Sequence, residues 1–404
     1  MSAKELIYDW NMVEQSAGAP QQQISLHDET LRDGLQSPSV QEPPIEQKIE
    51  LLHLMNELGL DAADIGLPGA GGTHAEGVAE MVREIVKEKM NIRPVCAART
   101  HAADITPIVE ISKRTGVPVE VAMFIGSSPI RFYAEDWTLD KLLNLTEEGV
   151  CLAVKEGIPV NYVTEDTTRA DPKTIRALYT TAIRCGAKAV TVCDTVGHAT
   201  PDGTRSVIGY VKKVIEETGG DVRLEWHGHQ DRGFGVINSI AALEAGANRI
   251  HGSAIGVGER VGNTPMDLLL VNLKLLGWID NDLSRLREYC EKAAKAVGWT
   301  IPLNYPVFGR DAFRTATGVH AAAVIKSYKK GDAELADMIY SGVPAALFGL
   351  KQVIEVGPMS GKSNVIYWLE SRGIEATEER VTRIYEHAKK AHAVLEEQEV
   401  MALV

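Results

Sequence analysis

The chain has 404 residues, of which 45% are apolar and 24% are charged, a composition typical of a globular protein with a large core. Its formal net charge of −13 argues against a general nucleic-acid-binding protein, because neutralising phosphates requires a basic face. No stretch approaches the roughly 18 consecutive apolar residues of a membrane helix. The polar N-terminal extension, residues 1–23, does not resemble a signal peptide. We therefore expect a cytoplasmic protein that binds neither nucleic acid nor a membrane.

The five cysteines are scattered along the chain, with an odd count and no C-x-x-C pair. This pattern favours a reducing compartment and argues against a disulfide framework or a structural zinc site.

From about residue 24 to residue 277, short apolar runs alternate with amphipathic stretches. The candidate strands are residues 24–28, 61–66, 92–99, 118–126, 158–166, 189–195, 223–231 and 249–256. The helical patterns between them include residues 45–58, 74–89, 139–155 and 233–245. Each strand is followed by a helix, as parallel strands require. Eight such units in roughly 250 residues predict an α/β fold, a (β/α)8 TIM barrel, as the catalytic domain over residues 24–280.

An open doubly wound sheet is the alternative architecture. It would usually have fewer strands and a phosphate-binding G-x-G-x-x-G sequence after the first of them. Here the first strand continues instead into Arg32, Asp33 and Gly34. The barrel is therefore the favoured prediction.

After residue 277 the regular alternation stops. Residues 281–297 are predicted to form a helix, followed by a connection rich in Pro and Gly, the segment 313–327, and charged amphipathic helices within residues 344–390. This stretch is too short and too helical for a second barrel. Residues 281–404 are therefore predicted to be a mostly helical C-terminal lid and dimerisation region.

A candidate metal site arises from two short sequences far apart in the chain. Residues i and i+2 of a strand face the same way, so His227 and His229 can direct both rings at one point. If Asp33 reaches that point from another strand end, the three residues form a divalent-metal site with coordination positions open for a substrate. Mixed nitrogen and oxygen ligands leave Mg, Mn, Zn, Co and Fe(II) all feasible. Alone, such a His pair is more often two exposed or hydrogen-bonded residues of a strand.

Active sites of TIM barrels lie at the C-terminal ends of the strands. The polar residues expected at those ends are Arg32, Asp33, Arg99, Glu165, Asp166, Asp194, Thr195, His227 and His229. Their segregation to one end of the barrel indicates a single site. Beside a metal ligand, the permanently charged Arg32 is well placed to stabilise an oxyanion, although it could instead be a structural partner of Asp28 or Glu29.

Two further groups are candidates for proton transfer. Glu165 and Asp166 are consecutive, so only one of them can face the barrel axis; we favour Glu165, with Asp166 paired to Arg169. The alternative is an acidic pair in a surface loop. His320 lies outside the barrel, and a lone His is more often structural than catalytic.

Four motifs together carry a family resemblance over residues 24–373. They are Asp28-x-Thr30-Leu31-Arg32-Asp33-Gly34, His227-x-His229, Asn238-Ser239-x-Ala241-Ala242-x-x-Ala245-Gly246-Ala247 and Gly258-Glu259-Arg260-x-Gly262-Asn263. This set resembles the DRE-TIM metallolyase superfamily. Within it, the chain resembles the Claisen-condensing branch of 2-isopropylmalate, homocitrate and citramalate synthases, and overall most closely a 2-isopropylmalate synthase without the C-terminal regulatory domain. No leucine inhibition through such a domain is expected.

The resemblance implies roles for the metal-site residues. Asp33, His227 and His229 would bind a divalent metal cation, with Asn263 on or near it, and Arg32 would polarise the carbonyl of the substrate. The implied reaction condenses acetyl-CoA, as co-substrate, with a 2-oxo acid and releases CoA.

The resemblance also implies substrate and acid-base residues. Thr195 matches a position that holds the carboxylate of the 2-oxo acid, and Arg99 and Arg131 are further candidates for substrate binding. Glu165 and His320 match the acid-base pair of the synthases. In those enzymes the His comes from the lid of the partner subunit, which implies a homodimer with lid exchange.

Several departures from the family pattern leave the substrate open. Arg131 stands where 2-isopropylmalate synthases usually have His; it could accept a second substrate carboxylate, as homocitrate chemistry needs, or contact CoA phosphates. Pyruvate and aromatic or longer-chain 2-oxo acids are further alternatives. The lyase branch, which includes hydroxymethylglutaryl-CoA lyase, uses a Cys in the loop after strand 8. Residues 253–260 contain no Cys, so carbon-carbon cleavage is the less favoured alternative.

Overall fold

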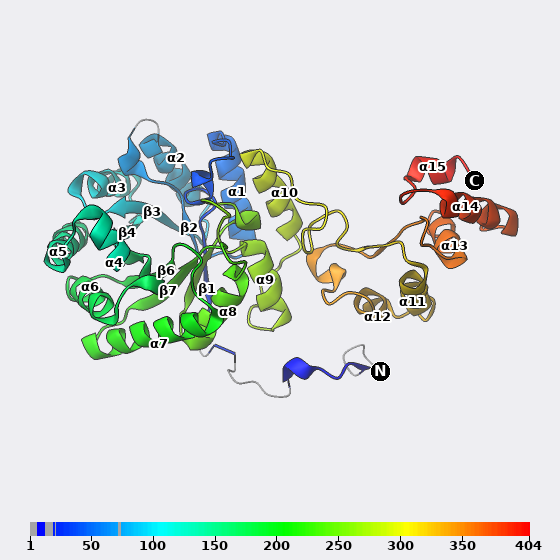
Figure 1. The fold of residues 1–404 in the computed structure, drawn as a ribbon. Coiled ribbons are helices and arrows are strands. Elements are labelled where there is room, and N and C mark those ends of the chain that lie inside the picture. Colours follow the sequence, from blue (N-terminus) through cyan, green and yellow to red (C-terminus); the bar gives the residue numbers. More distant parts are fainter. Residues whose placement is uncertain (1–5, 13–18, 21, 72–73) are drawn as a thin grey trace. The chain divides into compact units, whose positions relative to one another are not determined.

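The computed structural model describes residues 6–12, 19–20, 22–71 and 74–404. It divides into two compact units, one formed by Ser16–Thr300 and the other by Met1–Gln15 with Ile301–Val404. Figure 1 shows the course of the chain through each unit. In the part of the chain that is described, no helix is both long enough and apolar enough to cross a membrane.

The larger unit is built on a closed barrel of eight parallel strands in sequence order (Figure 1), with β8 returning to pair with β1. The strands are β1 (Ser25–Asp28), β2 (Ala62–Asp64), β3 (Arg93–Arg99), β4 (Glu120–Gly126), β5 (Val160–Glu165), β6 (Ala189–Asp194), β7 (Arg223–Gly228) and β8 (Arg249–Gly252). The predicted (β/α)8 barrel is confirmed. Three predicted strands end two or more residues earlier than expected: β2 stops at Asp64, β7 stops at Gly228, and β8 stops at Gly252, before the 3-10 turn of residues 254–256.

Helices surround the strands and connect each one to the next. They are α1 (Ile45–Glu57), α2 (His74–Lys87), α3 (Ala102–Thr115), α4 (Pro129–Glu135), α5 (Leu139–Lys155), α6 (Pro172–Arg184), α7 (Pro201–Thr218), α8 (Gly235–Ala245), α9 (Met266–Leu275) and α10 (Leu286–Val297). Short 3-10 helices in this unit are η3 (Gly34–Gln36), η4 (Pro68–Ala70), η5 (Thr167–Arg169) and η6 (Ala254–Gly256).

Helix α6 shows why these segments are helical. Asp171 accepts hydrogen bonds from the backbone N–H groups of Lys173 and Thr174, and Pro172 occupies the first turn, where its missing N–H costs nothing. Buried residues then recur three and four positions apart, as in Ile175, Leu178 and Tyr179, so one face packs against the strands. The same amphipathic design holds the outer ring of helices on the barrel.

The interior of the barrel is unusually polar. Three buried apolar residues form a small cluster, Ala62, Val95 and Ala122, with Val163 packed against them. Alternate residues of each strand point inward, so β1 directs Ser25 and His27 to the interior. Small alanine side chains and polar groups leave room along the axis, and this room is what the sites below occupy.

The smaller unit is mostly helical, as predicted. Its elements are η2 (Trp10–Met12), β9 (Arg314–Thr315), α11 (Gly318–Lys329), α12 (Ala333–Met338), η7 (Ala345–Phe348), β10 (Val353–Ile354), α13 (Lys362–Glu370), α14 (Glu378–Lys390) and α15 (Glu397–Met401). The parallel pair β9 and β10 was not predicted, because strands of two residues carry no periodic pattern. Helix α10, which begins at Leu286, belongs to the larger unit. The boundary after residue 280 stays a prediction.

Candidate metal centre and active site

A cavity of about 240 Å³ lies at the C-terminal ends of the strands. It is lined by Glu29, Arg32, Asp33, Gln36, Leu67, Ala97, Ala122, Phe124, Val163, Glu165, Cys193, Thr195, His227, His229, His251 and Glu259. Charged and imidazole groups from β1, β7 and β8 form one wall of this catalytic-end cavity. Apolar side chains from β3, β4 and β5 form the opposite wall.

The three predicted metal ligands come together in this cavity. One ligand atom from each of Asp33, His227 and His229 lies within 4.8 Å of the others, and all three residues are buried. The two Nε2 atoms of His227 and His229 are 3.2 Å apart, and His229 Nε2 is 3.9 Å from an oxygen of Asp33. His229 lies just beyond β7, where it forms an isolated bridge with Asn263. The two rings therefore point the same way even though β7 ends at Gly228, between the two residues.

Asn263 is positioned by a tight loop over residues 256–262. Its side-chain amide donates to Asp33 Oδ2 at 2.6 Å, and its backbone N–H donates to the carbonyl of Gly256 at 3.0 Å. Gly262 has a φ of +96°, and a Cβ at this position would lie 1.8 Å from the Gly256 carbonyl oxygen. Only glycine fits there, so the loop geometry that presents Asn263 to Asp33 depends on Gly262.

The donor set fits a divalent cation. Burial, and then the neighbouring His227, lower the pKa of His229 to about 4, so its imidazole is neutral at pH 7 and has a lone pair to offer. Burial alone would raise the pKa of Asp33, but neighbouring positive charge, that of Arg32 above all, lowers it and keeps this carboxylate ionised. Asn263 Oδ1 is buried without a hydrogen-bond partner among the described residues. Two imidazoles, a carboxylate and a free amide oxygen match the ligands of divalent metals.

Arg32 is fixed beside this centre by three carboxylates. Its guanidinium donates to Glu29 at 2.5 Å, to Asp64 at 2.9 Å and to Asp33 at 3.0 Å. Of the two structural partners considered for Arg32, Glu29 is a real one and Asp28 is not: Asp28 contacts Tyr289 and Thr30 instead. Structural pairing and a catalytic position are compatible, because Arg32 still lines the cavity.

Sequence reasoning did not identify the chain of groups behind the metal ligands. Glu29 lies 3.6 Å from His227 Nδ1 and 2.9 Å from His251 Nδ1, and the other ring nitrogen of His251 is 3.0 Å from Glu225. Burial alone would lower the pKa of His251, but its bonds to Glu225 and Glu29 raise it to about 9, so it is protonated at neutral pH. Glu29 therefore orients a candidate metal ligand and Arg32 at once. The alternation of Ser25, His27 and Glu29 along β1 was the available signal.

Glu165 lies at the end of β5 and lines the cavity. Burial raises the pKa of this carboxyl, and Asp166 adds to the effect, although Arg131 opposes it. Asp166 pairs with Arg169 at 2.7 and 2.8 Å, as predicted. Thr195 also lines the cavity, and its hydroxyl accepts the backbone N–H of Asp166 at 2.8 Å. The ends of β5 and β6 are thereby held together beside the metal centre.

Three other predicted residues lie apart from the cavity lining. Arg99 is largely exposed, and its guanidinium is held by both carboxylate oxygens of Asp104. Arg131, on α4, has Nη2 3.9 Å from Glu165, so it stands at the edge of the site rather than in its wall. His320 is on α11 in the smaller unit, where its exposed ring stacks on Tyr340 at 4.1 Å between centroids.

Comparisons with known proteins identify similar chains and a similar fold. The model of the HMGL-like family matches residues 23–291. Homocitrate synthase AksA of Methanopyrus kandleri is 31% identical over 370 residues, covering 91% of this chain and 87% of that protein. A probable 2-isopropylmalate synthase of the same organism is also 31% identical, covering 91% of this chain and 69% of that protein.

Among solved structures, hydroxymethylglutaryl-CoA lyase from Pseudomonas aeruginosa is similar, with a TM-score of 0.59 and 21% identity. The match covers 73% of this chain and 97% of that one, and at this identity it shows the fold alone. The extent of the family match, the two relatives and the barrel with its buried Asp-His-His cluster lead to one conclusion: the chain belongs to the HMGL-like, or DRE-TIM, family.

Proposed function

We propose that the protein is a divalent-metal-dependent acyltransferase that condenses acetyl-CoA with a 2-oxo acid and releases CoA. The observation that carries this proposal is the convergence of Asp33, His227 and His229 within 4.8 Å, beside the Arg32 guanidinium, in one cavity. A bound divalent cation would supply a Lewis acid and a template for the carboxylate and ketone of the 2-oxo acid. The names of the curated relatives, homocitrate and 2-isopropylmalate synthase, support the same reaction class.

Arg32 has the properties needed to stabilise the alkoxide formed on the ketone carbon. It is permanently charged, it lines the cavity, and three carboxylates prevent its rotation. A donor that is already oriented toward the oxygen that gains charge needs no reorganisation when the reaction occurs. Thr195 is the proposed contact for the carboxylate of the 2-oxo acid.

The acid-base half of the reaction is assigned to Glu165 and His320. Burial raises the pKa of Glu165 and brings it nearer to neutrality, which favours proton transfer from a weak carbon acid such as the acetyl methyl group. We propose that His320 comes from the C-terminal unit of a second copy of the chain, in a homodimer with exchanged lids. The exposure of its ring is consistent with a residue that completes its role in another subunit.

The shape of the cavity favours an apolar 2-oxo acid. Leu67, Ala97, Ala122, Phe124 and Val163 form an apolar wall, and neither Arg99 nor Arg131 is among the lining residues. A substrate with a second carboxylate would leave that charge unpaired against this wall, at a cost of several kcal/mol. We therefore propose 2-oxoisovalerate as the substrate, as in 2-isopropylmalate synthases.

A homocitrate synthase is the second candidate, and one contact favours it. Arg131 Nη2 is 3.9 Å from Glu165, and Arg131 Nε is buried without a partner among the described residues. A rotation of this side chain toward Glu165 would bring its guanidinium to the mouth of the cavity. There it would bind the second carboxylate of 2-oxoglutarate. A lyase is disfavoured. The one cysteine among the described lining residues is Cys193, and burial raises the pKa of its thiol well above the usual value.

The decisive experiment is a thiol-release assay. Acetyl-CoA is incubated with the protein and one of a panel of 2-oxo acids (2-oxoisovalerate, 2-oxoglutarate, pyruvate, oxaloacetate and aromatic pyruvates), with and without added divalent metal. We expect metal-dependent thiol release with 2-oxoisovalerate. Release with none of the acids would refute the synthase proposal. Release with 2-oxoglutarate alone, abolished by Arg131→Ala, would establish the homocitrate alternative.

A further inference from the structure

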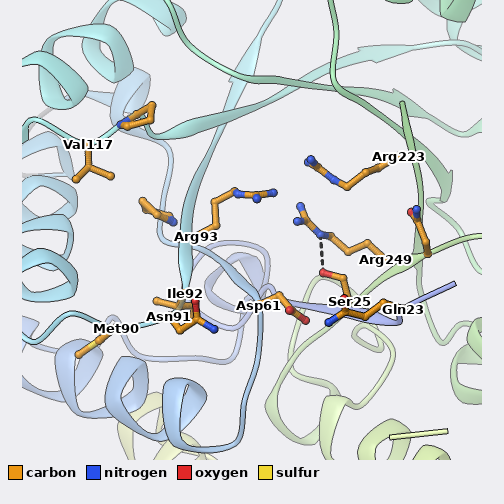
Figure 2. A pocket seen from close by; sticks show the side chains of 13 residues that line it. Gln23, Ser25, Asp61, Met90, Asn91, Ile92, Arg93, Val117, Arg223 and Arg249 are labelled. Carbon is orange, nitrogen blue, oxygen red and sulfur yellow. Dashed lines mark hydrogen bonds between the residues drawn. The ribbon is translucent and has the colours of Figure 1, made fainter. Parts of the chain in front are cut away.

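A second and larger pocket lies at the opposite, N-terminal end of the barrel. Its volume is about 530 Å³, and Figure 2 shows the residues that line it. They are Gln23, Ser25, Asp61, Met90, Asn91, Ile92, Arg93, Pro94, Val117, Pro118, Arg223, Asn248 and Arg249. These residues come from the starts of the strands and the loops before them, so the pocket is separate from the catalytic-end cavity.

Three guanidinium groups converge in this N-terminal pocket. Arg93, Arg223 and Arg249 lie at the starts of β3, β7 and β8, and in Figure 2 their side chains extend toward one another. Like charges do not gather without a counter-ion, and Glu120, one layer deeper, provides it. This carboxylate is 2.7 Å from Arg223, 3.1 Å from Arg249 and 3.4 Å from Arg93.

The arrangement is preorganised rather than a set of mobile surface side chains. The side chain of Arg249 is only 3% exposed, and its Nε donates to Ser25 at 3.1 Å while Nη1 contacts both Glu120 and Glu225. Arg223 is likewise held at two points, by Glu120 and by Glu225. Arginines fixed in this way bind an oxyanion at a smaller entropic cost than free side chains do.

The cluster has donor groups to spare. Each guanidinium carries five N–H donors. Arg93 Nη2, Arg223 Nη1 and Arg249 Nη2 have no hydrogen-bond partner among the described residues. The three cations contact two carboxylates, Glu120 and Glu225, and Glu225 is shared with His251. Asp61 stands at the pocket rim, where its carboxylate accepts the backbone N–H of Leu26 at 2.8 Å.

We propose that this N-terminal pocket is a binding site for a small oxyanion, a phosphate or a carboxylate group. Unused, forked N–H donors on the two fixed guanidiniums and on Arg93 match the oxygens of such groups, which Arg recognises through paired hydrogen bonds. The contrasting view is an ion-pair cluster that only closes the barrel floor. That view accounts for the contacts with Glu120 and Glu225, but it gives no role to the N–H groups of the three arginines that lack a partner among the described residues.

The test is calorimetric titration of the full chain with inorganic phosphate at constant ionic strength, and separately with acetate. Arg93→Gln removes the guanidinium with the weakest protein contact and should leave the fold intact. We expect saturable binding of at least one of the two anions and a loss of affinity of about tenfold or more in Arg93→Gln. Arg114→Gln is the matched control, because it removes an exposed arginine outside the pocket; it should bind like the parent.

Asn91→Asp provides a second variant that leaves the arginine cluster untouched. Asn91 lines the rim, and its backbone N–H is held by Asn56, so the change adds only a negative charge. It should also weaken anion binding. If neither anion binds the parent saturably, or if both variants bind as the parent does, the cluster is only a structural ion-pair network and the proposal is wrong. Comparing the two titrations shows whether the site prefers a phosphate or a carboxylate.

Discussion

The two ends of the barrel use the same charged groups in opposite roles. At the catalytic end, one arginine, Arg32, is held by the carboxylates of Glu29, Asp33 and Asp64. At the N-terminal end, one carboxylate, Glu120, is held by three guanidiniums. Among the described residues, the first arrangement leaves the acceptor Asn263 Oδ1 unpartnered, and the second leaves guanidinium N–H groups unpartnered.

The difference shows what each end is suited to bind. Spare acceptors beside a carboxylate attract a cation, whereas spare guanidinium donors attract an anion. The two ends are joined through the axis by Glu29, His251 and Glu225, with contacts of 2.9 and 3.0 Å. Each of the following predictions would weaken or sharpen this contrast.

The largest effect is expected from Asp33→Ala. Loss of the carboxylate removes the only anionic member of the candidate metal triad, so thiol release should fall by roughly a thousandfold or more. Metal affinity, measured by calorimetry on the metal-free protein, should fall in parallel. Asp202→Ala, at an exposed aspartate of α7, is the control and should change neither quantity. Unchanged metal affinity in Asp33→Ala would show that the metal does not bind at this position.

Arg32→Lys should lower kcat by about 100-fold to 1000-fold, because a lysine cannot reproduce the oriented guanidinium that stabilises the developing alkoxide. The positive charge is retained, so metal affinity should stay close to that of the parent. Steady-state kinetics over a range of 2-oxo acid concentrations separates kcat from KM. An effect on KM alone would mean that Arg32 only binds the ground state.

Stability should depend on pH through His251. Its pKa of about 9 in the folded protein exceeds the ordinary value of 6.5, so the native state binds this proton more tightly than the unfolded state does. The resulting stabilisation is complete below about pH 6.5 and is lost as pH rises through 9, with a maximum of about 3 kcal/mol. Asp64, whose burial raises its pKa to about 7, acts in the same direction at lower pH.

The free energy of unfolding should therefore be measured between pH 7 and pH 9, by denaturant unfolding of the metal-free protein. The parent should lose stability over this range. His251→Asn should show a flatter profile with a lower stability at pH 7. Equal slopes for the two proteins would show that His251 is not the proton-binding link between the two ends.

Glu29→Gln should reduce metal affinity by about 10-fold to 100-fold, the size typical of groups that orient a metal ligand. Gln keeps the shape of the side chain but cannot carry the charge that faces His227 and Arg32. Calorimetric metal titration is the readout, and Glu76→Gln, at an exposed carboxylate, is the control. A reduced kcat with normal metal affinity would mean that Glu29 orients Arg32 and not the candidate metal ligand His227.

The smallest effect is expected at Arg99. Its guanidinium is paired with Asp104 and largely exposed, so Arg99→Gln should leave kcat/KM within about twofold of the parent. Arg131→Gln is the comparison, since Arg131 stands 3.9 Å from Glu165. A larger effect at Arg99 than at Arg131 would mean that substrate binding draws Arg99 away from Asp104.

The barrel and the convergence of Asp33, His227 and His229 could be predicted from sequence because each has a local signature. The strand-helix alternation appears in the apolar pattern, and the spacing of His227 and His229 directs both rings to one side even though β7 ends between them. Asp33 lies in the short loop that follows the first strand, so the C-terminal end of the barrel is the place it can reach.

The groups behind the metal ligands could not be predicted in the same way. Glu29 and His251 are 222 positions apart, and their contact depends on the register in which β1 pairs with β8, where His27 lies opposite His251. The position of Arg99 was equally hidden. Strand alternation predicts on which side of β3 the Arg99 side chain leaves the backbone. The position of its guanidinium is set by the bidentate pairing with Asp104.

Gly262 has a consequence for how this protein could acquire a new substrate. A Cβ at this position would meet the Gly256 carbonyl oxygen at 1.8 Å, so the loop that presents Asn263 tolerates no side chain there. Evolution or engineering therefore has little freedom on the metal side of the cavity. The opposite wall is different: Phe124 and Val163 come from neighbouring strands, and their apolar side chains have no hydrogen bond to lose. Changes of specificity should accumulate on β4 and β5, while the metal side stays fixed.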